Sequence, residues 1–304
     1  QTLQAIQSIP LIKNFLDYLK NPKLLIFIFQ ANEKYPWLGL QEGLTIFLRR
    51  ELLSEKIQRK LGPEKEVFEG KSADLFSQII FVHEFMHFFS FYLIDEALKN
   101  LKLIDKEIEF YFTIVTQDIK DNSYKIKSPL EIIRLLLENK EVSDKDKQFL
   151  RFCHSPYLWQ PDIALKIFTY ILNNFFDEKL SKEIIDTISF KKYHVLMRIV
   201  ENIDERFSYL IRIEEFLAQF LALALFDDLL VEQLSEARRK FGDALIYPQN
   251  FSTENLKEVH LKILNYFGLE KPPFEIPSNL KQELIYASNL PFILNLQPEA
   301  PNLS

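Results

Sequence analysis

The 304-residue sequence contains a single cysteine, Cys153, and only six glycines. One thiol excludes a fold held by internal disulfides and suits a reducing compartment, so we expect a cytoplasmic protein. Scarce glycine, together with apolar residues that recur mostly at intervals of three and four, indicates helices. The sequence therefore predicts a mainly α fold, with at most a small β-sheet in its N-terminal part.

The sequence also lacks long uninterrupted apolar stretches and long basic clusters. A membrane-spanning helix needs roughly 18–20 uninterrupted apolar residues. The longest candidate, Ile79–Ile94, is interrupted by two histidines and a glutamate. Lys and Arg number 37 against 43 Asp and Glu, which gives a formal net charge of −6, and no long basic cluster stands out. We therefore expect neither a membrane span nor a nucleic-acid partner.

Large apolar residues are abundant, because 47% of the chain is hydrophobic and 28 residues are phenylalanine. Ser128, Pro129 and Glu131 form a helix start, and the helix is predicted to run to Glu141. Apolar periodicity predicts further helices over Leu11–Lys20, Gly43–Leu61, Ala73–Leu101, Pro161–Phe176, Lys182–Ile188, Lys192–Ile203, Glu205–Phe241, Thr253–Phe267 and Asn279–Ala287. Strands are predicted over Leu24–Phe29, Glu66–Phe68 and Ile108–Thr116.

One motif carries recognisable chemistry, the sequence His83-Glu84-Phe-Met-His87 inside a predicted helix. Histidines four residues apart lie one above the other on a helix, so both imidazoles can reach one ion. Glu84 can project beside that ion and take a proton from water, whose pKa zinc lowers to near neutrality. The apolar neighbours indicate a buried helix, in which these polar side chains need ligation or pairing. The alternative to a metal site is a core histidine pair satisfied by carboxylates.

Other families that share part of this motif do not fit. A metzincin needs Gly and His at the third and sixth positions after the second His, where this chain has Ser90 and Leu93. A ferritin-like di-iron site needs a second Glu-x-x-His, and none of the other histidines follows a glutamate at that distance. The inverted His-x-x-Glu-His order is also absent.

A catalytic zinc ion needs a third protein ligand, with the fourth position left to water. Asp95 and Glu96 are the nearest acidic residues that follow the motif. If the helix continues without a break, Asp95 lies roughly 12 Å beyond His87 along the axis, which is out of reach. The ligand must then come from another element.

The better candidate is a carboxylate at the start of an apolar helical stretch, Ile213–Ala224. Glu215 shares one side of this predicted helix with Ala218 and Ala222, and small alanines allow a close approach to the histidine helix. Glu214 is a rival ligand, and both glutamates could instead belong to a solvated helix start.

A His-Glu-x-x-His helix followed by Glu-x-x-Ala-x-x-x-Ala resembles the gluzincin metallopeptidases, including the small IrrE-like and the membrane-linked HtpX-like ones. The resemblance covers two short segments. It implies a zinc peptidase in which His83, His87 and Glu215 bind Zn²⁺ and Glu84 is the general base. Two departures stand out: the gap between the motifs is long, and Gln219 occupies the position where many gluzincins carry an aspartate that orients a zinc histidine.

We expect two lobes around a zinc cleft: 1–125, with the histidine helix and any sheet, and 126–304, which supplies the third ligand. The expected partner is a peptide or protein substrate. The alternatives are a hydrolase of a non-peptide amide and a non-catalytic scaffold with a structural metal or none. Candidates for stabilising the oxyanion are Tyr157, Tyr193, His194, Tyr209 and Arg212.

Overall fold

A computed structural model of the protein describes residues 1–20, 22–30, 38–42, 44–61, 64–103, 127–154, 161–190, 205–227, 230–231 and 253–287. In these residues the fold is mainly helical, with a three-stranded and a two-stranded sheet close to the N-terminus. This confirms the predicted fold class. The division into two lobes stays a prediction.

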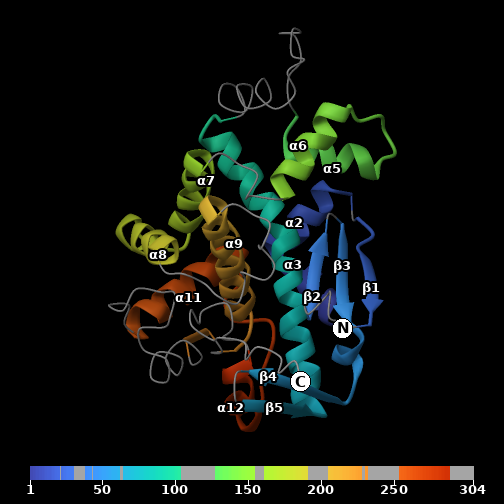
Figure 1. The fold of residues 1–304 in the computed structure, drawn as a ribbon, viewed down its shortest axis with the longest axis vertical. Helices are drawn as coiled ribbons and strands as arrows, with labels where there is room; N and C mark the ends of the chain where they lie inside the picture. Colours follow the sequence, from blue (N-terminus) through green and yellow to red (C-terminus); the bar gives the residue numbers. More distant parts are fainter. Residues whose placement is uncertain are drawn as a thin grey trace, which may run out of the picture.

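Helix α3 (Lys71–Asn100) runs along the long axis through the middle of the molecule (Figure 1). Gly70 precedes it with φ 57°, a left-handed conformation that lets the chain turn sharply out of the preceding strand. The three-stranded sheet lies on one side of α3 and helices α7, α8, α9 and α11 lie on the other (Figure 1). A helix covered in this way must be apolar nearly all round, and α3 buries phenylalanines on successive turns.

The three-stranded sheet has the order β1-β3-β2, with β1 (Leu25–Phe29) parallel to β3 (Thr45–Arg49) and β2 (Gly39–Glu42) antiparallel to it. Among the described strands, β2 therefore lies at an edge of the sheet, and it packs against α3. On β3, Ile46 and Leu48 are buried while their neighbours are partly exposed, a period of two that places one face of the strand on the core.

The predicted helix over Gly43–Leu61 is wrong. The structure has β3, a short 3-10 helix η1 (Arg50–Leu53) and strand β4 (Lys56–Leu61), which pairs with β5 (Glu64–Glu69) in a hairpin leading to α3. In a short apolar run the periods of helix and strand are hard to separate, and pairing with β1 and β2 decides in favour of the strand. Strand β5 confirms the strand predicted around Glu66–Phe68, and β1 confirms the one at Leu24–Phe29.

Most of the other predicted helices are confirmed. The remaining helices are α1 (Thr2–Ser8), α2 (Pro10–Tyr18), α5 (Pro129–Leu137), α6 (Asp144–His154), α7 (Pro161–Asn173), α8 (Glu178–Phe190), α9 (Glu205–Ala224), α11 (Thr253–Phe267) and α12 (Ser278–Ala287). The Ser128 hydroxyl accepts a hydrogen bond from the Glu131 backbone N–H, as the N-cap pattern predicts. Helix α5 ends at Leu137 rather than Glu141, because Asn139 adopts φ 51° and the Lys140 N–H turns back to the Leu135 carbonyl.

The helix predicted over Glu205–Phe241 is interrupted after Ala224, where α9 ends. Residues 230–231 are again helical, and 232–241 lie outside the described residues. The chain turns after Ala224 because Phe226 forms a parallel bridge with Phe274, in which the Asp227 N–H donates to the Phe274 carbonyl at 2.9 Å. The rings of Phe226 and Phe274 also stack, with centroids 4.8 Å apart. This tertiary contact outweighs helical periodicity. The predicted helix at Lys192–Ile203 and the predicted strand at Ile108–Thr116 lie outside the described residues.

No helix in the described part of the chain is both long enough and apolar enough to cross a bilayer.

Candidate metal centre

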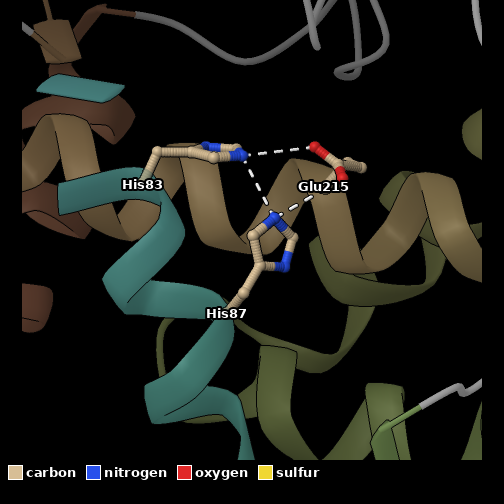
Figure 2. Close-up of side chains that lie close together, drawn as sticks. All are labelled: His83, His87 and Glu215. Atoms are coloured by element: carbon tan, nitrogen blue, oxygen red, sulfur yellow. Dashed lines mark hydrogen bonds and ion pairs between the residues drawn. The ribbon is translucent and has the colours of Figure 1, made fainter. Parts of the chain in front are cut away.

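Two histidines from α3 and one glutamate from α9 point toward one another (Figure 2). The Nε2 atoms of His83 and His87 are 3.1 Å apart. The Glu215 carboxylate closes the triangle, with Oε2 at 3.3 Å from His83 Nε2 and Oε1 at 3.4 Å from His87 Nε2. The structure thus brings together the three residues that the sequence proposed as ligands, and this group could hold a metal ion.

The spacing of these donor atoms fits a small tetrahedral cation. Bonds of about 2.0–2.1 Å from zinc to nitrogen and oxygen, at tetrahedral angles, place neighbouring donors roughly 3.3–3.4 Å apart. The three contacts in this protein, 3.1, 3.3 and 3.4 Å, lie close to that value, and the two that reach Glu215 end on its two different oxygens. A set of two imidazoles and one carboxylate is also a usual donor set for catalytic zinc. The residues present could therefore hold such a metal ion.

The site holds opposite charges in a largely buried setting. Burial opposes protonation of His87, but the carboxylates of Glu215 and Glu214 outweigh it and raise the pKa of His87 well above its usual range. Burial likewise opposes ionisation of Glu215, yet His87 and His83 hold the pKa of its carboxyl well below the usual range. A metal ion would therefore compete with a proton for His87. Glu215 is the most exposed of the three, with 32% of its side chain accessible.

Glu84 lies beside this group and is only 6% exposed. Burial raises the pKa of its carboxyl, while the two histidines and a hydrogen bond from the Gln41 backbone N–H oppose the shift. That N–H comes from the edge strand β2. The strand approaches so closely that a β-carbon on Gly39 would lie 2.5 Å from Glu84 Oε1 and 2.6 Å from its Cγ. Only glycine fits at position 39 without displacing the Glu84 side chain.

Gly39 and Gln41 are the residues of the site that the sequence interpretation missed. The prediction gave no element to residues 38–42 and extended a helix over the strand that follows. A four-residue strand carries too little pattern to be recognised, and its packing against α3 is a tertiary feature. The only sequence signal is the presence of Gly39 in a chain with six glycines.

The other acidic and histidine candidates serve the fold. Helix α3 continues without a break past His87, as predicted. Asp95 accepts the Leu130 N–H and pairs with Lys99. Glu96 accepts hydrogen bonds from the hydroxyls of Tyr92 and Tyr266.

His260, on α11, is buried. Its Nε2 lies 2.8 Å from the Ala224 carbonyl, at the end of α9. Among the oxyanion candidates, Tyr157, Tyr193 and His194 lie outside the described residues, and only the backbones of Tyr209 and Arg212 are described.

Gln219, at the position where many gluzincins carry the orienting aspartate, forms no hydrogen bond with His83 Nδ1. It is buried on α9. Within the described residues, His83 Nδ1 is buried without a hydrogen-bond partner. The outer nitrogen of His87 is different, because Glu214 Oε1 lies 3.5 Å from its Nδ1. Glu214, which the sequence left as a rival ligand, thus meets the side of His87 that points away from the group.

Replacing Gly39 by alanine tests the contact between β2 and Glu84. The added methyl group must push the Glu84 carboxylate away from the Gln41 N–H. A displacement of about 1 Å at a catalytic group can lower a rate by roughly a hundredfold. With Glu84 as the general base that the sequence predicts, we expect Gly39→Ala to retain metal and to lose about tenfold to a hundredfold in hydrolysis rate. The double variant Gly39→Ala/Glu84→Gln should lose no more activity than Glu84→Gln alone; additive losses would contradict this contact.

No protein-family model, curated protein or solved structure matches this chain. The resemblance to the gluzincins therefore rests on the two helical motifs and on the group that His83, His87 and Glu215 form. What the structure supports directly is a buried group of the His-Glu-x-x-His type that could hold a metal ion.

Proposed function

We propose that the protein is a zinc-dependent peptidase. The observation that carries the proposal is the group of contacts of 3.1–3.4 Å that His83 Nε2, His87 Nε2 and the two Glu215 oxygens make, beside the buried carboxylate of Glu84. Two imidazoles and a carboxylate leave one tetrahedral position open, which distinguishes catalytic from structural zinc sites. The ligand roles and the base role are predictions that the experiments below test.

The chain's own residues can supply the remaining chemistry. His83, His87 and Glu215 would hold the ion, which when bound supplies Lewis-acid polarisation of water and of the substrate carbonyl. Glu84 takes a proton from the attacking water on its carboxylate and passes it to the nitrogen of the leaving amine. The Gln41 N–H fixes that carboxylate during both transfers, since it donates from a backbone held in the sheet.

The edge strand supports a peptide as the substrate. Strand β2 pairs with β3 on one side, where the Leu38 carbonyl accepts the Arg49 N–H. Backbone groups alternate in direction along an antiparallel strand, so those of Gly39 and Gln41 face away from β3. This agrees with the hydrogen bond from Gln41 to Glu84. An extended peptide added along this edge would place its backbone next to Glu84, a common mode of peptide recognition.

Elemental analysis of the purified protein and a peptide-cleavage assay test the function together. We expect about one zinc ion per chain and cleavage of peptides in a mixed library. A chelator should stop the cleavage and added zinc should restore it. Zinc without turnover of peptides would favour the scaffold, and turnover of simple amides alone would favour the non-peptide hydrolase. A protein that binds no zinc would contradict the proposal.

A further inference from the structure

Two consecutive glutamates of α9 approach the same imidazole at its two different nitrogens. Glu215 Oε1 lies 3.4 Å from His87 Nε2, the nitrogen that also faces His83 at 3.1 Å. Glu214 Oε1 lies 3.5 Å from His87 Nδ1. Glu215 therefore contacts the His87 nitrogen that faces His83, Nε2, and Glu214 contacts the other ring nitrogen, Nδ1.

We propose that Glu214 is a positioning residue, which accepts the Nδ1–H of His87 and leaves the Nε2 lone pair directed at the metal. The inference rests on the proposed function only in requiring that His87 binds a metal ion. A neutral imidazole has one donor and one acceptor nitrogen. A carboxylate at Nδ1 can only accept, so it selects the tautomer in which Nε2 is free to bind the ion.

The contact between Glu214 and the His87 ring is largely shielded from water, which strengthens the preference for one tautomer. Glu214 has only 18% of its side chain exposed and His87 only 10%, so water has little access to their contact. A charged acceptor in such a place also makes the imidazole a stronger donor to the metal. His83 has no comparable support, because its Nδ1 lacks a hydrogen-bond partner within the described residues.

The arrangement differs from the pattern in the resembling family. Many gluzincins carry an aspartate four residues after the ligand glutamate, whereas this chain has Gln219 there. In this protein the charged support comes from the residue that directly precedes the ligand, and it serves His87. Glu214 is thereby distinguished from a fourth ligand, since its carboxylate meets the nitrogen that does not face His83 or Glu215.

Zinc affinity in matched variants tests this role. Loss of the group that orients a metal-binding histidine typically weakens metal binding about 10–100-fold. We expect Glu214→Ala to raise the zinc dissociation constant by that factor, measured by competition with a chromogenic chelator at fixed pH. Glu214→Gln should restore most of the affinity, because its amide oxygen still accepts the Nδ1–H. Glu258→Ala, at an exposed glutamate of α11 that pairs with Lys262, is the control and should bind zinc like the wild type.

A spectroscopic measurement separates positioning from ligation. The visible absorption spectrum of Co²⁺-saturated Glu214→Ala should match that of the wild type, because the ligands are unchanged. If Glu214→Ala does not fold, Glu214→Met takes its place in the comparison with Glu214→Gln. Methionine has a side chain of similar length but no oxygen that can accept the Nδ1–H.

Two results would overturn the role of Glu214. One is a wild-type zinc affinity in Glu214→Ala or Glu214→Met, which have no oxygen that can accept the Nδ1–H. The other is a loss as large as that of Glu215→Ala, together with a changed Co²⁺ spectrum, which would make Glu214 a ligand. If the wild type binds zinc but cleaves no peptide, the peptidase proposal fails and these affinities still decide the role of Glu214. A wild type that binds no zinc overturns both.

Discussion

Glu84→Gln is expected to slow peptide hydrolysis by at least about a hundredfold while zinc stays bound at about one ion per chain. Glutamine keeps the shape of the side chain and still accepts the Gln41 N–H, but it takes no proton from water at neutral pH. General-base catalysis contributes roughly a hundredfold to ten-thousandfold to a rate, and we expect a loss in that range. Steady-state hydrolysis of a cleaved peptide, with elemental analysis of the same samples, measures both quantities.

The control for this variant is Glu258→Gln, since Glu258 is an exposed glutamate on α11. It should retain wild-type hydrolysis and wild-type zinc. Unchanged activity in Glu84→Gln would defeat the mechanism, because the residue would then not move a proton in the rate-limiting step. Loss of zinc in Glu84→Gln would instead assign this carboxylate to the metal, in place of Glu215 or beside it.

Glu215→Ala and His83→Ala should each release most of the zinc. If the roughly 10–16 kcal/mol of zinc binding measured in small metal-dependent domains were shared by four ligands, one ligand would account for about 2.5–4 kcal/mol. That corresponds to a roughly hundredfold to thousandfold weaker affinity. Chelator competition measures this change. The rise in melting temperature that zinc produces in the wild type should shrink in parallel.

His260→Gln is the matched histidine control, because His260 is buried and its Nε2 contacts the Ala224 carbonyl rather than the metal group. This variant should melt at a lower temperature than the wild type and keep its zinc. Wild-type zinc affinity in either Glu215→Ala or His83→Ala would show that the donor triangle is a buried polar cluster and not a metal site.

The histidine helix was predictable because two independent signals agree over a long segment. Apolar residues recur along the whole of α3, which has 30 residues. The four-residue spacing of His83 and His87 brings both imidazoles to one side only if the segment is a helix. The partner helix α9 was also predictable, with Glu215 on the side that meets α3. Both inferences depend only on local periodicity, which is the most reliable information in a single sequence.

The remaining parts of the site depend on contacts between distant segments. Strand β2 is four residues long, and its place against Glu84 follows from the order of the sheet. The roles of Glu214 and Glu215 depend on the rotation of α9 about its axis relative to His87. The end of α9 at Ala224 depends on a bridge to Phe274. None of these features leaves a periodic trace in the sequence, so each required the structure.

The two histidines of the donor triangle share one stiff helix, whereas the carboxylate comes from a second one. Any shift of α9 along or away from α3 changes the two edges that reach Glu215 and leaves the edge between the imidazoles as it is. The affinity of this group for a metal ion would therefore report how closely α9 packs against α3. Substitutions far from any donor atom would lower the metal affinity if they loosen the packing of α9 against α3.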